Sequence, residues 1–95
     1  MALISKADLG FTDYNWTIFR GDDPRVSGAP DETVFNGSEG HEVLYLINKM
    51  AKINNFKQKF SGLKVERMLR EVLPPEVQTQ IDIIHWIGKN WTSYK

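Results

Sequence analysis

Apolar residues in the second half of the chain recur at the three- and four-residue spacing of α-helices. This pattern predicts one helix over about residues 39–53, a second over about 62–73 and a third over about 75–91. The second helix must end at Pro74-Pro75, since proline lacks an amide hydrogen, and Pro75 is well tolerated in the first turn of the third. We expect three packed helices from these segments.

The predicted helix ends carry residues that suit them. Asn36 or Ser38 is placed to cap the first helix, and Ser61 is placed to cap the second. Asn54-Asn55 suits a left-handed end of the first helix, because asparagine tolerates a positive φ better than most residues. Within the second helix, the pair Glu66 and Arg70 has the spacing of an ion pair on the water-facing side.

The first third of the chain has a different pattern, with a period of two. Apolar and polar side chains alternate from Asp13 to Ile18, as in a half-buried strand, and the apolar patch 33–35 is a candidate second strand. We therefore predict an α+β fold, mainly α: a three-helix C-terminal core with an N-terminal strand or short β-hairpin packed on it. Trp16 and Phe19 are expected to cover the third helix.

The length of the chain favours a single domain over residues 1–95. Residues 1–37 are too few to hold a second core, so we expect an extended and loop region packed on a helical core of residues 38–95. With 41 % apolar and 25 % charged residues, the composition is typical of a folded domain. The pattern leaves open whether the acidic loop 21–32 is ordered.

Composition also limits the expected cellular location and the expected classes of partner. The chain has no cysteine, which excludes disulfides and thiolate metal sites. It also has no run of about 18 apolar residues that could span a bilayer. We expect a cytoplasmic protein with no membrane partner.

Motifs for catalysis or metal binding are incomplete. His41-Glu42 begins like the His-Glu-x-x-His zinc pattern, but its fifth position is Tyr45. Ser61 and Lys64 have the Ser-x-x-Lys spacing of penicillin-binding enzymes without the companion motifs of those enzymes. We therefore expect no enzyme, no catalytic residue, no metal or other cofactor and no small-molecule substrate.

Charge is unevenly distributed along the chain, although the net charge is zero. Residues 1–40 hold seven acids and three bases, whereas residues 41–95 hold nine bases and five acids. Residues 49–70 are basic and aromatic, with Phe56 and Phe60 among the lysines, which makes nucleic-acid binding one hypothesis. Its candidate residues are Lys49, Lys52, Lys57, Lys59, Lys64, Arg67 and Arg70. The alternative is that both phenylalanine rings close the bottom of the helical core. The sequence pI of about 6.7 is low for a nucleic-acid-binding domain, and the charge asymmetry equally suits attraction between two parts of one fold.

The leading hypothesis is a non-catalytic protein-interaction module of a small accessory protein, such as those of bacteria or their phages. On a helical wheel Trp86 falls about 150° from the centre of the apolar face of the third helix, with Ile83 between them. Either the N-terminal strand, which is the simpler explanation, or a partner covers this large side chain. Tyr45 lies among lysines on the outer side of the first helix. Since tryptophan and tyrosine dominate protein interfaces, we take Trp86, Tyr45 and Ile83 as interaction candidates. The partner is another protein or a second copy of the chain.

Overall fold

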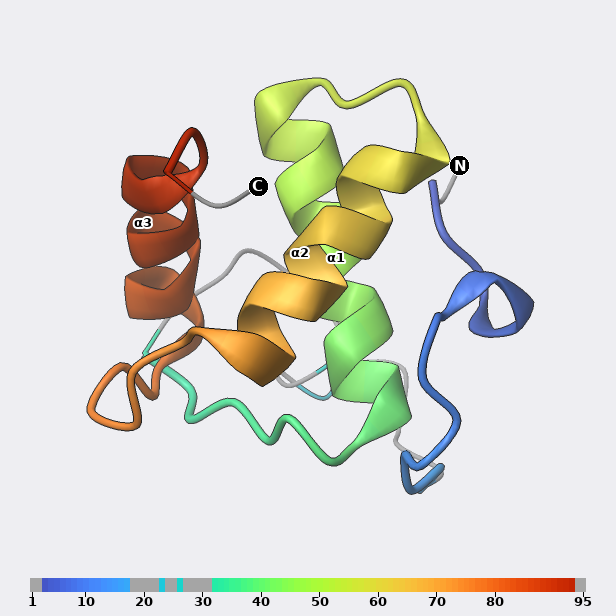
Figure 1. The fold of residues 1–95 in the computed structure, drawn as a ribbon. Helices are drawn as coiled ribbons and strands as arrows, with labels where there is room; N and C mark the ends of the chain where they lie inside the picture. Colours follow the sequence, from blue (N-terminus) through green and yellow to red (C-terminus); the bar gives the residue numbers. More distant parts are fainter. Residues whose placement is uncertain (1–2, 18–22, 24–25, 27–31, 94–95) are drawn as a thin grey trace.

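A computed structural model describes residues 3–17, 23, 26 and 32–93 of the chain (Figure 1). Within these residues it contains one short 3-10 helix, η1 (Lys6–Asp8), and three α-helices, α1 (Gly40–Asn54), α2 (Lys59–Glu71) and α3 (Gln80–Asn90). The prediction of three helices in the second half of the chain is confirmed, and the fold is mainly helical. None of the described helices is long and apolar enough to cross a membrane.

Two helices begin at positions other than those predicted. Helix α2 starts at Lys59, after Gln58, so Ser61 lies inside the first turn and does not cap the helix. Helix α3 starts at Gln80, because the hydroxyl of Thr79 accepts a 3.3 Å hydrogen bond from the Asp82 amide. The prediction that Pro75 opens the third helix is therefore wrong. The prolines form a turn that precedes a threonine cap.

The ends of α1 agree with expectation at one end only. Asn55 has a left-handed backbone with a φ of 58°, as predicted for the C-terminal end. At the N-terminal end the capping side chain is Glu39, which accepts a hydrogen bond from the His41 amide. Asn36, predicted as a cap, instead accepts a 2.9 Å hydrogen bond from the amide of Ser38. A longer acidic side chain here replaces the expected short one.

No named strand occurs in the parts of the chain before α1 that the structure describes. Asn15 forms an isolated parallel bridge with Glu39, and Val34 forms an antiparallel bridge with Thr79, so these two segments do not pair with each other there. Side-chain burial still alternates with a period of two: Tyr14 is buried, Asn15 exposed and Trp16 half-buried. Residues 18–22 and 27–31, which include Ile18 and Phe19, lie outside the described residues.

Trp16 packs at the beginning of α1 and not on α3. Its ring lies edge-on to the ring of His41, with a centroid separation of 5.0 Å. A Cβ atom at Gly40 would lie 2.5 Å from the Trp16 ring, so only glycine permits this close approach. The N-terminal segment, residues 3–17, is thereby fixed against the first turn of α1.

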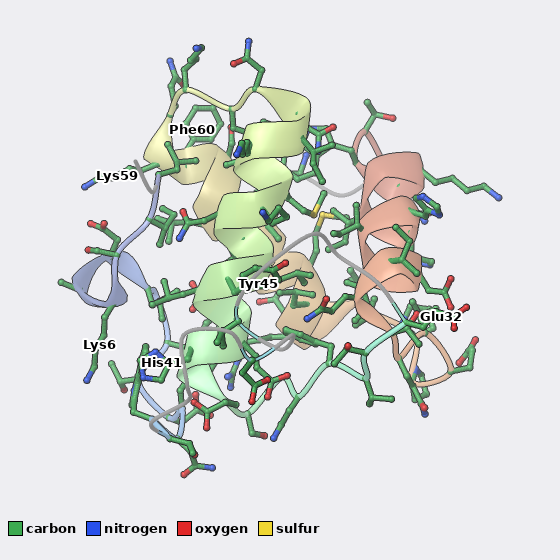
Figure 2. All side chains as sticks on the ribbon, turned by 180° about the vertical axis from the view of Figure 1, so that it is seen from behind. Lys6, Glu32, His41, Tyr45, Lys59 and Phe60 are labelled. Atoms are coloured by element: carbon green, nitrogen blue, oxygen red, sulfur yellow. The ribbon has the colours of Figure 1, made fainter. Side chains whose placement is uncertain are left out.

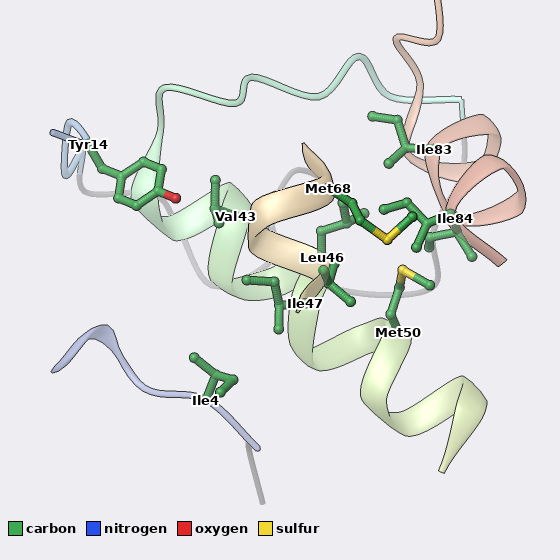
Figure 3. Packing of buried hydrophobic residues seen from close by; sticks show 11 residues of the cluster. Ile4, Tyr14, Val43, Leu46, Ile47, Met50, Met68, Ile83 and Ile84 are labelled. Atoms are coloured by element: carbon green, nitrogen blue, oxygen red, sulfur yellow. The ribbon is translucent and has the colours of Figure 1, made fainter. Parts of the chain in front are cut away.

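Helix α1 is the centre of the core, since it packs against both α2 and α3 (Figure 3). Each of the three helices contributes fully or nearly fully buried side chains, and Ile4 and Tyr14 join them from the N-terminal segment (Figure 3). The buried cluster comprises Ile4, Tyr14, Val43, Leu46, Ile47, Met50, Val65, Met68, Ile83, Ile84 and Ile87. The N-terminal segment is therefore part of the core and completes it.

Ile4 closes the gap between α1 and α2. The Asn48 side chain accepts a 2.8 Å hydrogen bond from the Ile4 amide and donates a 2.9 Å bond to the Ile4 carbonyl. On the other side, a Cβ atom at Gly62 would lie 2.5 Å from Cγ1 of Ile4 and 3.1 Å from Ile47. The absence of a side chain at Gly62 lets the segment seat against α2.

Candidate functional site

A buried carboxylate on α2 holds the N-terminal segment in place. Glu66, 1 % exposed, accepts hydrogen bonds from the Gly10 amide at 2.8 Å and the Phe11 amide at 3.4 Å. It also accepts a 2.6 Å bond from the hydroxyl of Tyr14. This cluster fastens a loop to a helix.

The predicted surface pair of Glu66 with Arg70 does not form, because Glu66 is turned into the core. Arg70 instead donates a 2.7 Å hydrogen bond to Asp13, and its guanidinium lies over the rings of Phe11 and Tyr14 at 4.1 and 5.3 Å. On a helical wheel Glu66 lies at the edge of the apolar face, near Gly62, and this position is the feature of the sequence that could have indicated its burial. The i, i+4 spacing alone gave the wrong partner.

Burial and hydrogen bonding shift the pKa values of Tyr14, in the N-terminal segment, and of Glu39, which binds that segment. Burial, and then the hydrogen bond to Glu66, raises the pKa of the Tyr14 hydroxyl above its ordinary value. Burial alone would raise the pKa of Glu39, but hydrogen bonds from Thr17 and from the His41 amide outweigh it and lower that pKa. Both carboxylates, Glu39 and Glu66, thus bind backbone amides of the first seventeen residues.

A third buried carboxylate acts in the same way. Glu42, 2 % exposed, accepts a 3.1 Å hydrogen bond from the amide of Asn36. No group of three histidine, cysteine, aspartate or glutamate side chains among the described residues is arranged to hold a metal ion. We interpret these buried acids as structural, since each is matched to backbone donors.

The predicted protein-interaction residues are placed unequally. Ile83 is 1 % exposed and belongs to the core, so its side chain is not available to a partner. Trp86 is half-buried against the same cluster. Tyr45 is half-buried with the ammonium of Lys49 5.5 Å from its ring centroid. Only Trp86 and Tyr45 offer surface, and each offers part of its ring.

Four of the seven predicted nucleic-acid candidates have partners within the chain. Lys49 lies over Tyr45, Lys59 forms a 3.0 Å ion pair with Asp8, and Arg70 pairs with Asp13. Lys64 donates a 2.7 Å hydrogen bond to the carbonyl of Trp91 and lies 4.2 Å from the centroid of that ring. The other three, Lys52, Lys57 and Arg67, are exposed.

Two large apolar side chains are exposed within residues 49–70, the segment that the sequence marked as basic and aromatic. Phe60 is 64 % exposed in the first turn of α2, and Ile53 is 56 % exposed in the last turn of α1. Phe56, between them, is half-buried and stacks on Trp91 at a centroid distance of 5.0 Å. Sequence reasoning treated Phe56 and Phe60 alike, because only the tertiary fold decides which ring turns inward.

Exposed lysines are next to Ile53 and Phe60 in the sequence and lie in the connector between them. Lys52 and Lys57 are exposed, and Lys59 lies beside Phe60 in Figure 2 with its side chain 63 % exposed despite its ion pair. We call the surface formed by Lys52, Ile53, Lys57, Lys59 and Phe60 the basic-apolar end. The backbone amides at the N-terminus of helix α2 add to its positive potential, and the first turn of the helix has no acidic residue to offset them.

One acid reaches this region from the N-terminal segment. A hydrogen bond from the Ser5 amide, and then one from Lys59, lowers the pKa of Asp8 to about 2. Ser5 also donates to the same carboxylate through its hydroxyl. Asp8 therefore carries a full negative charge near neutral pH and orders Lys59 without removing it from the surface.

Comparison with known proteins indicates no function, so a function must be inferred from the site itself. No family model matches the sequence, no curated protein matches it, and no solved structure matches the fold.

Proposed function

We propose that the chain is a non-catalytic protein-binding module and that the basic-apolar end is its contact surface. The observation that carries this proposal is the exposure of Phe60 and Ile53, at 64 % and 56 %, on either side of one short connector. Burying an aromatic or large aliphatic side chain contributes about 1.5–3 kcal/mol. Aromatic side chains are also enriched among the residues that dominate protein interfaces.

The packed residues next to this surface support it as a binding site. Gly62, two residues after Phe60, packs against Ile4, and Ile53 lies two residues after the buried residue Ala51. The connector itself is held by the stack of Phe56 on Trp91. Preorganised side chains lose little conformational entropy when a partner binds.

Trp86 and Tyr45 remain in this proposal as secondary contacts. Both rings are half-buried, so each has less surface to offer than Phe60. Tyr45 lies two turns before Lys52 on α1, which places it beside the basic-apolar end and not within it. Ile83 is left out of the surface because it lies in the core.

Site-specific photo-cross-linking tests this proposal. A photoreactive phenylalanine analogue at position 60 preserves the aromatic ring, and the same analogue at His85, an exposed position on α3, serves as the control. We expect a protein adduct from position 60 in extracts of cells that carry the gene, and a much weaker one from position 85. Equal adducts from both positions, or none from position 60, contradict the proposal.

Nucleic-acid binding is the second candidate function. It is favoured by Lys52, Lys57 and Phe60, which together offer exposed cations and one exposed aromatic ring on which a base could stack. It is weakened by the internal partners of Lys49, Lys59, Lys64 and Arg70. A salt titration with single-stranded and duplex DNA tests it, and affinity absent at low salt excludes it.

We also propose that the protein is located in the cytoplasm. A cytoplasmic accessory protein is supported by the lack of cysteine, since secreted small domains commonly depend on disulfides. Fractionation of cells that express a tagged chain tests the location directly. Recovery from an exported or membrane fraction contradicts it.

A further inference from the structure

Two other large apolar side chains are exposed at the opposite end of the molecule. Val72, 41 % exposed, directly follows α2, and Val34, 62 % exposed, is bridged to Thr79 just before α3. Figure 1 shows the α1–α2 connector at one end of the fold and the α2–α3 turn at the other. The 13 residues of α2 separate the two ends by about 18 Å, at a rise of about 1.5 Å per residue.

The charges around this second pair are mainly of the opposite sign, and the base in the last turn of α2, Arg70, is paired with Asp13. Glu32, Glu71 and Glu76 are exposed, and Figure 2 places Glu32 on the far side of the molecule from Lys59 and Phe60. Residues 71–88 contain three acids and no lysine or arginine, whereas residues 43–65 contain five lysines and no acid. We call the surface formed by Glu32, Val34, Glu71, Val72 and Glu76 the acidic-apolar end.

We propose that copies of this chain associate head to tail, with the basic-apolar end of one copy bound to the acidic-apolar end of the next. The proposal rests on the proposed function and names its partner as a second copy. Each end offers two exposed apolar side chains, and the charges around them are complementary. These four are the exposed large apolar residues of the part of the chain that the structure describes.

The distribution of charge selects this arrangement over a two-fold dimer. A two-fold interface brings the same patch of both copies together, so Lys52 and Lys57 would face their own equivalents. Like charges in contact oppose such an interface. A head-to-tail contact is heterologous and extends into a chain of copies unless its rotation closes a ring.

Charge-reversal variants of the full chain test the proposal by sedimentation velocity, from micromolar to millimolar protein. One double variant, Lys52→Glu with Lys57→Glu, reverses the basic-apolar end, and another, Glu71→Lys with Glu76→Lys, reverses the acidic-apolar end. The control, Lys6→Glu with Arg67→Glu, makes the same change in net charge as the first double variant, at exposed positions that belong to neither end. Circular dichroism verifies that each variant is folded.

We expect the wild-type mass to rise with protein concentration, and association to weaken at least tenfold from about 50 mM to about 500 mM salt. Each end-reversed variant alone should associate at least tenfold more weakly, an equimolar mixture of the two should regain association, and the control should match the wild type. Phe60→Ser should weaken association without a change of charge.

Three results overturn head-to-tail association: a wild-type chain that stays monomeric, reversed ends that leave association unchanged, or a mixture that does not recover. A monomeric chain whose position 60 still cross-links to a different protein refutes self-association and leaves the proposed function standing. A nuclease-sensitive adduct at position 60 refutes both and favours nucleic acid.

Discussion

The hydroxyl of Tyr14 donates a 2.6 Å hydrogen bond to the carboxylate of Glu66, a residue 52 positions further along the chain. Both side chains are buried, and the contact fastens the N-terminal segment to the middle of α2. The core formed by the three helices therefore also needs Tyr14, which lies well before α1 in the sequence.

Tyr14→Phe should lower the free energy of unfolding by about 1–3 kcal/mol, because a buried carboxylate loses a hydrogen-bond donor while the ring remains. Chemical denaturation measures the change. A double-mutant cycle with Glu66→Gln isolates the pair and should give a coupling energy above about 0.5 kcal/mol. Purely additive effects of the two substitutions would show that the contact contributes nothing to stability.

Gly62→Ala should destabilise the protein although alanine favours helices. Its new methyl group would lie 2.5 Å from Cγ1 of Ile4, and overpacking of a core costs about 1–3 kcal/mol. Gly88→Ala on α3 is the matched control, since no atom lies within 4 Å of its added Cβ, and it should stabilise by about 0.5–1 kcal/mol. Thermal unfolding of the two variants should therefore shift in opposite directions, and shifts of the same sign would refute the seating of Ile4 against α2.

Ile83→Ala and Ile53→Ala make the same chemical change at 1 % and 56 % exposure. The first should cost about 2–5 kcal/mol of stability, because it leaves a cavity in the core. The second should change stability by no more than about 0.5–1 kcal/mol. Denaturant midpoints compare them, and similar losses would mean that Ile53 is packed and not free for a partner.

The pKa of Asp8 offers a test of the contacts around Lys59. It should titrate near the value of about 2 and not near its ordinary 3.8. Because the folded pKa is the lower one, this contribution to stability is present above about pH 4 and is lost as the pH falls toward 2. Carboxyl chemical shifts measured against pH give the pKa directly.

Lys59→Met should raise the Asp8 pKa only partway, since the larger cause of the shift is the hydrogen bond from the Ser5 amide. Asp13, which is paired with Arg70, is a reference group whose pKa should not respond to this substitution. An Asp8 pKa near 3.8 in the wild type would contradict the described ion pair and capping contacts.

Periodicity was enough to predict that three helices form, because α2 and α3 each bury a stripe of apolar residues against α1, but it did not predict where α2 and α3 begin. It could not predict that Glu66 is buried, since the donors that satisfy its carboxylate come from Gly10, Phe11 and Tyr14 in a distant segment. Glu39 presents the same difficulty, because its carboxylate accepts hydrogen bonds from the amide of Thr17. The partners of a buried charge are set by tertiary structure, which local spacing does not record.

The candidate surface was predictable only in part. The basic character of residues 49–70 is visible in the sequence, but the pairing of Lys59, Lys64 and Arg70 with groups elsewhere in the chain is not. The wheel position of Trp86 left open whether the N-terminal strand or a partner covers the ring, and the ring packs partly against the core. Phe60 is the most exposed large apolar residue described, whereas Phe56 stacks on Trp91, and the sequence does not distinguish the two rings.

The most direct test of the account is the dissociation constant of Phe60→Ser for whichever protein cross-links at position 60. We predict a loss of affinity of at least about thirtyfold, as for an interface residue worth about 2 kcal/mol, with the free energy of unfolding unchanged within about 0.5 kcal/mol. His85→Ser, the matched control, should bind as the wild type does. Unchanged affinity of Phe60→Ser would contradict the assignment of the basic-apolar end as the binding surface.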